Sequence, residues 1–389
     1  MSVDSRRSGA RLFRAATVVA GGVVHRPGWL EVAADGRVSS VGPRPPTGGS
    51  ACRATVDLRD GTVVPGFVDM HVHGGGGASF DAGSPEQVRT AIATHRAHGT
   101  TRMCASLVSA PPELLVRQVR ALVPQVESGA LAGIHLEGPW LAATRCGAHD
   151  PAALRLPKQD EIRRLLDAGA GTIRMVTLAP ELPGAPAAIE RFRAAGVVVA
   201  IGHTEADHRQ TRAAIAAGAS VAAHLFNAMR PIGHREPGPV VALTADPRVT
   251  VELIADGVHL DPAMYRWVGG LVGPSRIALI TDAMAAAGRP DGEYRLGTRP
   301  VTVTGGVARL TGSSTIAGST ATMDRLFRMA CGVPDGPDDS RLLAAVLQTS
   351  TVPARALGIP VHDLSPGTLA DLVVLSPEWE VRQVFSALD

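Results

Sequence analysis

The sequence predicts an α/β protein: a (β/α)8 barrel, with a small β-sandwich formed from both chain ends. Three observations carry this prediction. Between about residues 60 and 290, short apolar runs alternate with helical stretches rich in alanine and arginine. Continuous apolar strands separated by helices are typical of a parallel sheet that is buried on both faces. There are eight such runs, which is the number that closes a barrel.

The eight runs share one design. Each begins with β-branched or other apolar residues, ends in polar residues and is followed by a helical stretch. In chain order they are VVPGFVDMHVHG, TTRMCASLVS, LAGIHLEGP, GTIRMVTLAPE, GVVVAIGHT, ASVAAHLFNAM, VTVELIADGVH and RIALITDAM.

Helix signals lie between these runs. In SPEQVRTAIATHRAHG, Ser84 can cap the helix, Pro85 takes the first turn, Gln87 completes a capping box and Gly99 ends it. DEIRRLLDAGAG and GAPAAIERFRAAG show comparable signals for the start and the end of a helix. Lys158 precedes the first of these two segments, so we expect it at the exposed start of a helix.

The two chain ends have a different pattern, with short alternating strands and Gly/Pro turns such as AADGRVSSVG and PGTLADLVVL. Such strands can pair into a small β-sandwich. We therefore assign residues 1–60 to the first part of the sandwich, 61–290 to the barrel, 291–312 to an insertion belonging to the sandwich, 313–360 to the last barrel helices and 361–389 to the last part of the sandwich.

Composition excludes several chemistries. The 389 residues include 38 Lys plus Arg and 36 Asp plus Glu, and Lys158 is the single lysine. Schiff-base catalysis, phosphate-loop lysines and carbamylated-lysine metal bridges all require a lysine in the site. The net charge of +2 carries no basic stripe, so we expect no nucleic-acid partner.

The cysteine spacing and the length of the apolar stretches indicate in which cell compartment the protein is expected. Cys52, Cys104, Cys146 and Cys331 lie far apart without a CxxC pair, which argues against a disulfide framework and a cysteine zinc site. No apolar stretch reaches roughly 18 residues, so we expect no membrane partner. A cytoplasmic protein fits these features.

Histidines and carboxylates end six of the eight runs. The carboxyl ends of the strands of a barrel meet at one rim, where active sites lie. A polar side chain after an apolar run is otherwise costly, so their joint occurrence predicts a metal site. These residues are His71, His73, His135, Glu137, His203, His224, Asp256, His259 and Asp282.

The spacing of these residues suggests how they would bind metal. Residues two apart on a strand point the same way, so His71 and His73 can reach one ion. His203 and His224 can supply nitrogens to a second ion. Asp282 can act as a weak ligand or as a base toward a metal-activated water. Nitrogen and oxygen ligands without thiolate suit zinc, iron or another first-row divalent ion, with one or two ions per subunit.

The missing lysine identifies the bridge between the two ions. The fourth run, GTIRMVTLAPE, contains no lysine that could be carbamylated. A carboxylate must then bridge, and Glu137 is the one placed to do so. His135, two residues earlier, points the same way one layer deeper and is expected to support the site or the core.

Motif strings along the chain are similar to those of a known family. PGFVDMHVHG, HLEGPW, LAPE, GHTEA, HLFNAM, REPG, IADGVH and TDAM occur in family order between about residues 60 and 375. They resemble the N-acetylglucosamine-6-phosphate deacetylase family of the amidohydrolase superfamily. The resemblance implies a metal-dependent barrel hydrolase that converts N-acetylglucosamine 6-phosphate to glucosamine 6-phosphate and acetate, in amino-sugar catabolism or cell-wall recycling.

The resemblance also assigns roles to the strand-end residues. It implies that Glu137, His203 and His224 hold the metal that the family retains, whereas His71 and His73 match family members with a second ion. Asp282 corresponds to the catalytic acid/base, and His259 would polarise the substrate carbonyl.

Substrate contacts follow from the same resemblance. In the family, the arginine that corresponds to Arg235 reaches into the neighbouring subunit's site, which implies a homodimer, and a guanidinium suits bidentate phosphate binding. Cys146 lies in the loop TRCGAHDP and is a candidate lid residue. The expected substrate-binding residues are Ala148, His149, Asn227, Ala228, Arg235, Asp256, His259, Ile316, Ala317 and Gly318.

Two alternatives remain open at this stage. One is an amidohydrolase that acts on a cyclic amide or on a different acetylated sugar. Phosphate recognition by Arg235 and His149 would distinguish this alternative from deacetylation of N-acetylglucosamine 6-phosphate. Comparable activity on unphosphorylated N-acetylglucosamine would favour the alternative. The other is a non-catalytic barrel that serves as an interaction scaffold, which would purify without metal.

Overall fold

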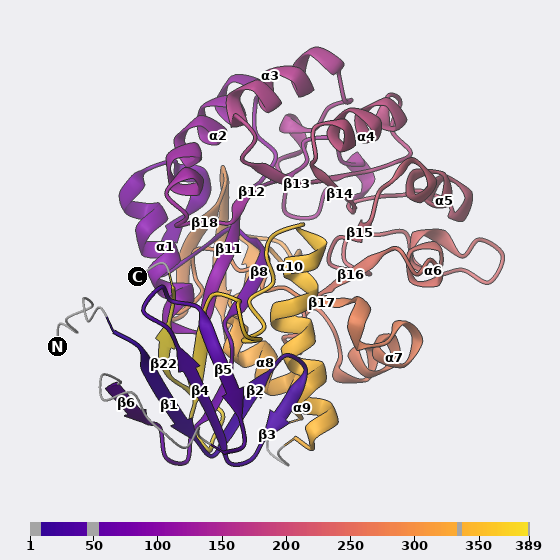
Figure 1. The fold of residues 1–389 in the computed structure, drawn as a ribbon. Helices are drawn as coiled ribbons and strands as arrows, with labels where there is room; N and C mark the ends of the chain where they lie inside the picture. Colours follow the sequence, from indigo (N-terminus) through magenta and orange to yellow (C-terminus); the bar gives the residue numbers. More distant parts are fainter. Residues whose placement is uncertain (1–8, 45–53, 333–336, 388–389) are drawn as a thin grey trace.

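A computed structural model describes residues 9–44, 54–332 and 337–387 (Figure 1). Its centre is an eight-stranded sheet whose neighbouring strands pair in parallel, in the order β17-β16-β15-β14-β13-β12-β11-β8. This confirms the predicted barrel class. The strands are β8 (Phe67–Val72), β11 (Thr100–Leu107), β12 (Gly133–Glu137), β13 (Ile173–Leu178), β14 (Val198–Ile201), β15 (Val221–Ala222), β16 (Thr250–Leu253) and β17 (Ile277–Leu279).

Helices separate consecutive barrel strands. Ser84 caps the first of them by accepting a hydrogen bond from the Gln87 N–H, as predicted. The Gln87 side chain does not complete the expected capping box, because it accepts instead from the Ser79 N–H at 3.2 Å. Lys158 is the exposed N-cap of α3. The helices are α1 (Pro85–Ala97), α2 (Pro112–Glu127), α3 (Gln159–Gly169), α4 (Ala185–Ala194), α5 (His208–Ala217), α6 (Gly238–Ala245) and α7 (Pro262–Val272).

The first and last barrel strands, β8 and β17, meet at their carboxyl ends. There the Asp282 N–H donates to the His71 carbonyl and the His73 N–H donates to the Ala283 carbonyl, both at 2.8 Å. The chain then forms α8 (Met323–Cys331), α9 (Asp339–Val346), a π-helical turn (Leu347–Thr351) and α10 (Val352–Ala356). The π-helical turn and α10 pack against both β8 and β17, so they cover the seam of the barrel (Figure 1).

Two further sheets, built from strands near both chain ends, form the predicted sandwich at the lower left of Figure 1. An apolar cluster that includes Phe13, Leu30 and Leu372 joins them. One sheet contains β5 (Val38–Gly42), β4 (Gly28–Val32), β1 (Arg11–Ala15) and β6 (Ala54–Asp57). The other contains β22 (Val381–Phe385), β21 (Leu372–Leu375), β7 (Thr62–Pro65), β2 (Thr17–Ala20) and β3 (Val23–His25).

Two segments differ from the expected domain division. The first predicted run is split: β7 pairs with β2 and β21 in the sandwich, and only β8 belongs to the barrel. Gly66 lies between them, where a Cβ atom would stand 2.3 Å from the Thr101 hydroxyl oxygen. Glycine at this position therefore lets the backbone pass close to Thr101 as the chain crosses from one sheet to the other.

The segment 291–312 was expected in the sandwich, and that expectation was wrong. It forms a separate three-stranded sheet of β18 (Gly292–Leu296), β19 (Arg299–Thr304) and β20 (Val307–Leu310). Its apolar side chains pack with Ala148, Met284 and Ala317, which belong to loops above the barrel. Alternating strand patterns identify such a hairpin but not the surface that it covers.

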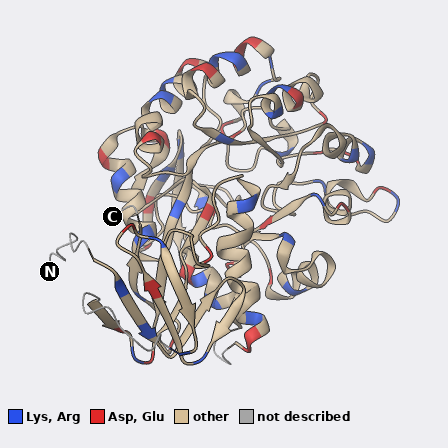
Figure 2. Cartoon of the chain, in the orientation of Figure 1, with Lys and Arg blue, Asp and Glu red and all other residues tan. Residues whose placement is uncertain are grey.

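Charged residues of both signs are spread over the described chain (Figure 2). Basic and acidic residues are interspersed over the helices in Figure 2. No helix within the described ranges is long and apolar enough to cross a membrane.

Candidate metal centre and active site

Six buried side chains from the strand ends converge on one point above the barrel. They form two groups, in each of which the potential ligand atoms lie within 4.8 Å of one another. One group comes from the two strands at the seam and the other from strands β12, β14 and β15. The groups are His71 with His73 and Asp282, and Glu137 with His203 and His224. These are the residues that the sequence predicted as metal ligands.

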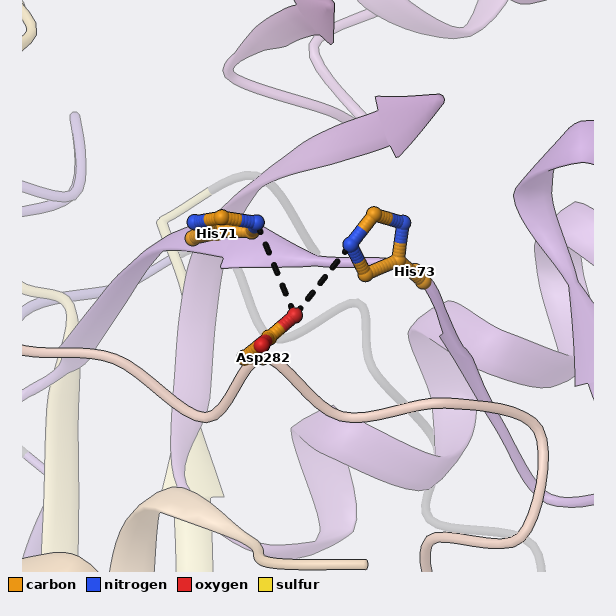
Figure 3. A group of neighbouring side chains, drawn as sticks. All are labelled: His71, His73 and Asp282. Carbon is orange, nitrogen blue, oxygen red and sulfur yellow. Dashed lines mark ion pairs between the residues drawn. The ribbon is translucent and has the colours of Figure 1, made fainter. Parts of the chain in front are cut away.

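The seam group has a carboxylate between two imidazoles (Figure 3). Asp282 Oδ1 lies 3.5 Å from His71 Nε2 and 3.2 Å from His73 Nε2. His73 Nδ1 lies 3.2 Å from the Ser106 carbonyl oxygen and must donate to it, since a carbonyl can only accept. In the neutral ring, His73 Nε2 then presents its lone pair to the site.

Glu137 connects the two groups. Its Oε1 lies 3.1 Å from His203 Nε2 and 3.0 Å from His224 Nε2. It also lies 3.4 Å from His71 Nε2, and Glu137 Oε2 lies 3.2 Å from His73 Nε2. The two oxygens of this carboxylate thus face both groups, as expected for a bridging ligand.

The ring nitrogens and carboxylate oxygens of this centre are arranged to bind a divalent cation and not to hydrogen-bond with one another. His203 Nδ1 lies 2.8 Å from the Arg145 carbonyl oxygen and must donate to it, so in the neutral ring Nε2 is a lone pair aimed at the Glu137 carboxylate. His71 Nε2 is buried without a hydrogen-bond partner among the described residues. Lone pairs converging on a carboxylate repel it, and a cation held between them removes that repulsion.

Burial and opposite charges set the protonation of the centre. Burial raises the pKa of Asp282, but attraction to His71 and the hydrogen bond with His73 outweigh it and lower the pKa to about 2. Burial lowers the pKa of His73, whereas hydrogen bonds to Asp282 and Glu137 raise it to about 9. Burial lowers the pKa of His203 to about 4. The carboxylates are therefore ionised at neutral pH.

Three of the six ligand residues have left-handed backbone angles. The φ values are 48° at His203, 26° at His224 and 48° at Asp282. A non-glycine residue held in this region costs about 1–3 kcal/mol, and such residues cluster at functional sites. The strand ends are thus bent to aim these side chains at one point.

A cavity of about 400 Å³ opens above the centre. Ala317 is fully buried and Arg235 is exposed, and neither is one of the described residues that line the cavity. Seven predicted substrate residues do line it: Ala148, His149, Asn227, Ala228, His259, Ile316 and Gly318.

His149 stands between the cavity and the bridging carboxylate. Its Nδ1 accepts from the Ser109 N–H at 3.1 Å, which leaves the ring proton on Nε2. That nitrogen lies 3.2 Å from Glu137 Oε2. His149 is therefore engaged with the metal centre, whereas the sequence analysis expected it to read the phosphate.

Asp256 lies behind His259 and not in the cavity. Its Oδ2 is 2.9 Å from His259 Nδ1, and its Oδ1 accepts from the N–H groups of Val258 and His259. Asp256 lines a separate, smaller pocket. Asp256 was expected to contact the substrate directly. It instead contacts His259, which faces the substrate cavity.

Several residues of the site were missed by sequence reasoning. Thr144, Arg145 and Gly147 flank the half-buried Cys146 in the predicted lid loop, and only tertiary packing shows that they line the cavity. Leu296 lines it from the three-stranded sheet. Ser314 and Thr315 line it from the segment that follows β20.

Two buried carboxylates beneath the site, Asp69 and Glu252, were also missed. Both side chains are fully buried. A signal for them existed in the sequence, because each is a single acidic residue inside an apolar run, FVDMHV and VTVELIA. An acidic residue buried in a barrel strand needs a partner.

Comparisons with known proteins agree with this geometry. The amidohydrolase family profile matches residues 62–387, and that family is metal-dependent. A Danio rerio N-acetylglucosamine-6-phosphate deacetylase is 36% identical over 85% of each chain, and an Escherichia coli N-acetylgalactosamine-6-phosphate deacetylase is 35% identical over 92% of this chain and 94% of that one.

Solved structures extend the likeness to the whole fold. A Mycobacterium smegmatis N-acetyl-D-glucosamine-6-phosphate deacetylase variant, in complex with N-acetyl-D-glucosamine-6-phosphate, is 55% identical. It superimposes with a TM-score of 0.94 over 98% of this chain and 99% of that chain. The chain therefore belongs to the amidohydrolase family and, within it, to the N-acetylglucosamine-6-phosphate deacetylases.

Proposed function

We propose that this chain hydrolyses the acetamide of N-acetylglucosamine 6-phosphate to give glucosamine 6-phosphate and acetate, in amino-sugar catabolism or cell-wall recycling. The observation that carries the proposal is the pair of histidine–carboxylate groups, joined by Glu137, at the floor of a cavity lined by the predicted substrate residues. The family relationship supports the same activity.

The six converging residues would hold two divalent cations, with Glu137 as the bridge. We propose zinc, because imidazole nitrogens and carboxylate oxygens suit it, with iron or another first-row metal as the alternative. When bound, such cations lower the pKa of a coordinated water and polarise a carbonyl.

Asp282 is the proton carrier of the proposed reaction. Its low pKa keeps it ionised, so it can accept a proton from the attacking water. As the C–N bond breaks, Asp282 returns that proton to the departing nitrogen. His259 lines the same cavity. Its Nδ1 donates to the Asp256 carboxylate, so in the doubly protonated ring Nε2 can also donate a hydrogen bond to the substrate carbonyl oxygen as negative charge develops there.

Phosphate recognition is assigned to Arg235 of a neighbouring subunit in a homodimer. Arg235 is exposed in the loop 230–237, and Ile232 of that loop is 48% exposed. Trp267 and Leu271 on α7 are 49% and 52% exposed. Exposed large apolar side chains of this kind mark candidate association surfaces.

Cys146 is proposed as part of a lid over the substrate. Its neighbours Arg145 and Gly147 both line the cavity, so movement of this loop would change access to it. The described cysteines, Cys104, Cys146 and Cys331, are free thiols, which supports a cytoplasmic location. Cys52 lies outside the described residues.

The test is acetate release from three substrates with metal analysis of the same preparation. We expect rapid turnover of N-acetylglucosamine 6-phosphate, slower turnover of N-acetylgalactosamine 6-phosphate and little of unphosphorylated N-acetylglucosamine. Faster turnover of the galactosamine compound would reassign the sugar. Equal turnover of the unphosphorylated sugar, or a metal-free active protein, would overturn the proposal.

A further inference from the structure

Glu252 is a fully buried carboxylate below the metal centre, on strand β16. It lies in an otherwise apolar strand and does not line the substrate cavity. Burying an ionised group without compensation costs several kcal/mol, so such a residue requires strong partners.

The partners of Glu252 are two of the proposed metal ligands. Its Oε2 lies 3.2 Å from His71 Nδ1 and 3.2 Å from the backbone nitrogen of His224, which donates to it. The other oxygen, Oε1, is buried without a hydrogen-bond partner among the described residues. One carboxylate oxygen therefore joins a ligand of the seam group to a ligand of the Glu137 group.

The bond to Glu252 determines which nitrogen of His71 can bind metal. A carboxylate accepts, so His71 Nδ1 carries a proton and, in the neutral ring, Nε2 keeps its lone pair. That lone pair faces Asp282 Oδ1 at 3.5 Å and Glu137 Oε1 at 3.4 Å, inside the centre. A carboxylate behind a histidine also makes the imidazole a stronger ligand.

Among the four ligand histidines, His71 is the one backed by a carboxylate. The Nδ1 atoms of His73 and His203 donate to the backbone carbonyls of Ser106 and Arg145. His224 Nδ1 has no hydrogen-bond partner among the described residues. The extra negative charge therefore lies behind the seam group.

We propose that Glu252 is the positioning residue that makes this chain a two-metal protein, by orienting His71 and supplying the charge that stabilises a second cation in the seam group. Two divalent cations bring four positive charges into a buried space. Glu137 and Asp282 supply only two negative charges, and Glu252 adds a third. The inference rests on the proposed function only in that both require metal at these residues.

The test is the metal stoichiometry of Glu252→Gln, which keeps the size of the side chain and removes its charge. Protein loaded with zinc and dialysed would be analysed for bound metal, and each affinity measured by competition with a chromophoric chelator. We expect two ions per chain in the wild type and one in the variant, with the weaker site losing about 10- to 100-fold in affinity. The tighter site should change little.

The matched control is Asp256→Asn. It removes a carboxylate that also bonds a histidine Nδ1, but His259 belongs to neither metal group. This control should retain two ions. Two ions of unchanged affinity in Glu252→Gln would overturn the proposal, as would loss of an ion from Asp256→Asn alone.

A variant that fails to fold still leaves a direct test on the wild type. In zinc-loaded protein labelled with nitrogen-15 histidine, the His71 ring should show a protonated Nδ1 and a metal-bound Nε2. Metal on His71 Nδ1 would overturn the proposal. These readouts are independent of turnover, so an inactive enzyme that binds two ions would contradict the proposed function and leave the role of Glu252 standing.

Discussion

The Nε2 atoms of His203 and His224 lie 3.1 Å apart, and both face the same oxygen of Glu137. Two ring nitrogens at this distance repel each other unless a proton or a cation lies between them. A cation held between them would remove this repulsion, so we expect metal binding to stabilise the folded protein.

Metal removal should lower the thermal stability of the protein. A ligand that binds only the folded state stabilises it by about 4 kcal/mol when present at a thousand times its Kd. We expect chelation to lower the melting temperature and zinc to restore it, as measured by calorimetry. Glu137→Gln is the control, since its melting temperature should respond much less to zinc. An unchanged melting temperature after verified metal removal would contradict the assignment.

Asp282→Asn should abolish turnover. The amide cannot accept the proton of the attacking water, and loss of a general acid/base typically costs about 10²- to 10⁴-fold. The ion held by Glu137, His203 and His224 should remain, which metal analysis of the variant would check. Turnover at a wild-type rate would remove Asp282 from the proposed mechanism.

Asp256→Asn should slow catalysis through His259. The carboxylate of Asp256 accepts the Nδ1 proton of His259 and carries the negative charge that balances a doubly protonated ring, whereas the neutral amide of asparagine carries no charge. We expect kcat to fall by about 10²-fold, as for loss of a hydrogen-bond donor to a developing oxyanion. A rise in KM alone would instead indicate direct substrate contact.

Arg235→Ala should weaken the binding of phosphorylated substrate and leave the metal content unchanged. If Arg235 serves the neighbouring site, mixing Arg235→Ala and Asp282→Asn subunits should raise activity at low substrate concentration above that of either variant alone, because one site of each mixed dimer would be complete. Light scattering would establish the dimer. No recovery in verified mixed dimers would place Arg235 at its own site or outside catalysis.

His95 should make stability depend on pH. It is fully buried with Nε2 2.8 Å from the Gly74 carbonyl oxygen, and burial lowers its pKa to about 4. Below the ordinary value near 6.5, the unfolded chain binds a proton that folded His95 does not. Its contribution to the free energy of unfolding should therefore fall by about 2 kcal/mol between pH 7 and pH 5.

His95→Gln keeps a hydrogen-bond donor but cannot titrate. Urea denaturation of both proteins with saturating metal would compare their stabilities at the two pH values. The variant should lose about 2 kcal/mol less than the wild type over this interval. Equal losses would show that His95 is not the responsible group.

The sequence predicted the metal groups because their residues follow apolar strands, and the rim of a barrel brings such positions together. It missed Glu252, since a single charge does not interrupt the apolar pattern of a strand. Arg145 and Leu296 were missed for another reason: they reach the cavity through loops and a small sheet whose placement depends on tertiary packing. The assignment of β7 to the barrel failed because strand periodicity continues across Gly66.

His71 and His73 belong to the first barrel strand, and Asp282 follows the last. The group that they form therefore spans the seam where the ring of strands closes. A cation held there would fasten the beginning of the barrel to its end, next to two backbone hydrogen bonds. Mutations that loosen this fastening would impair folding and chemistry together, so selection for activity would also preserve the closure of the barrel.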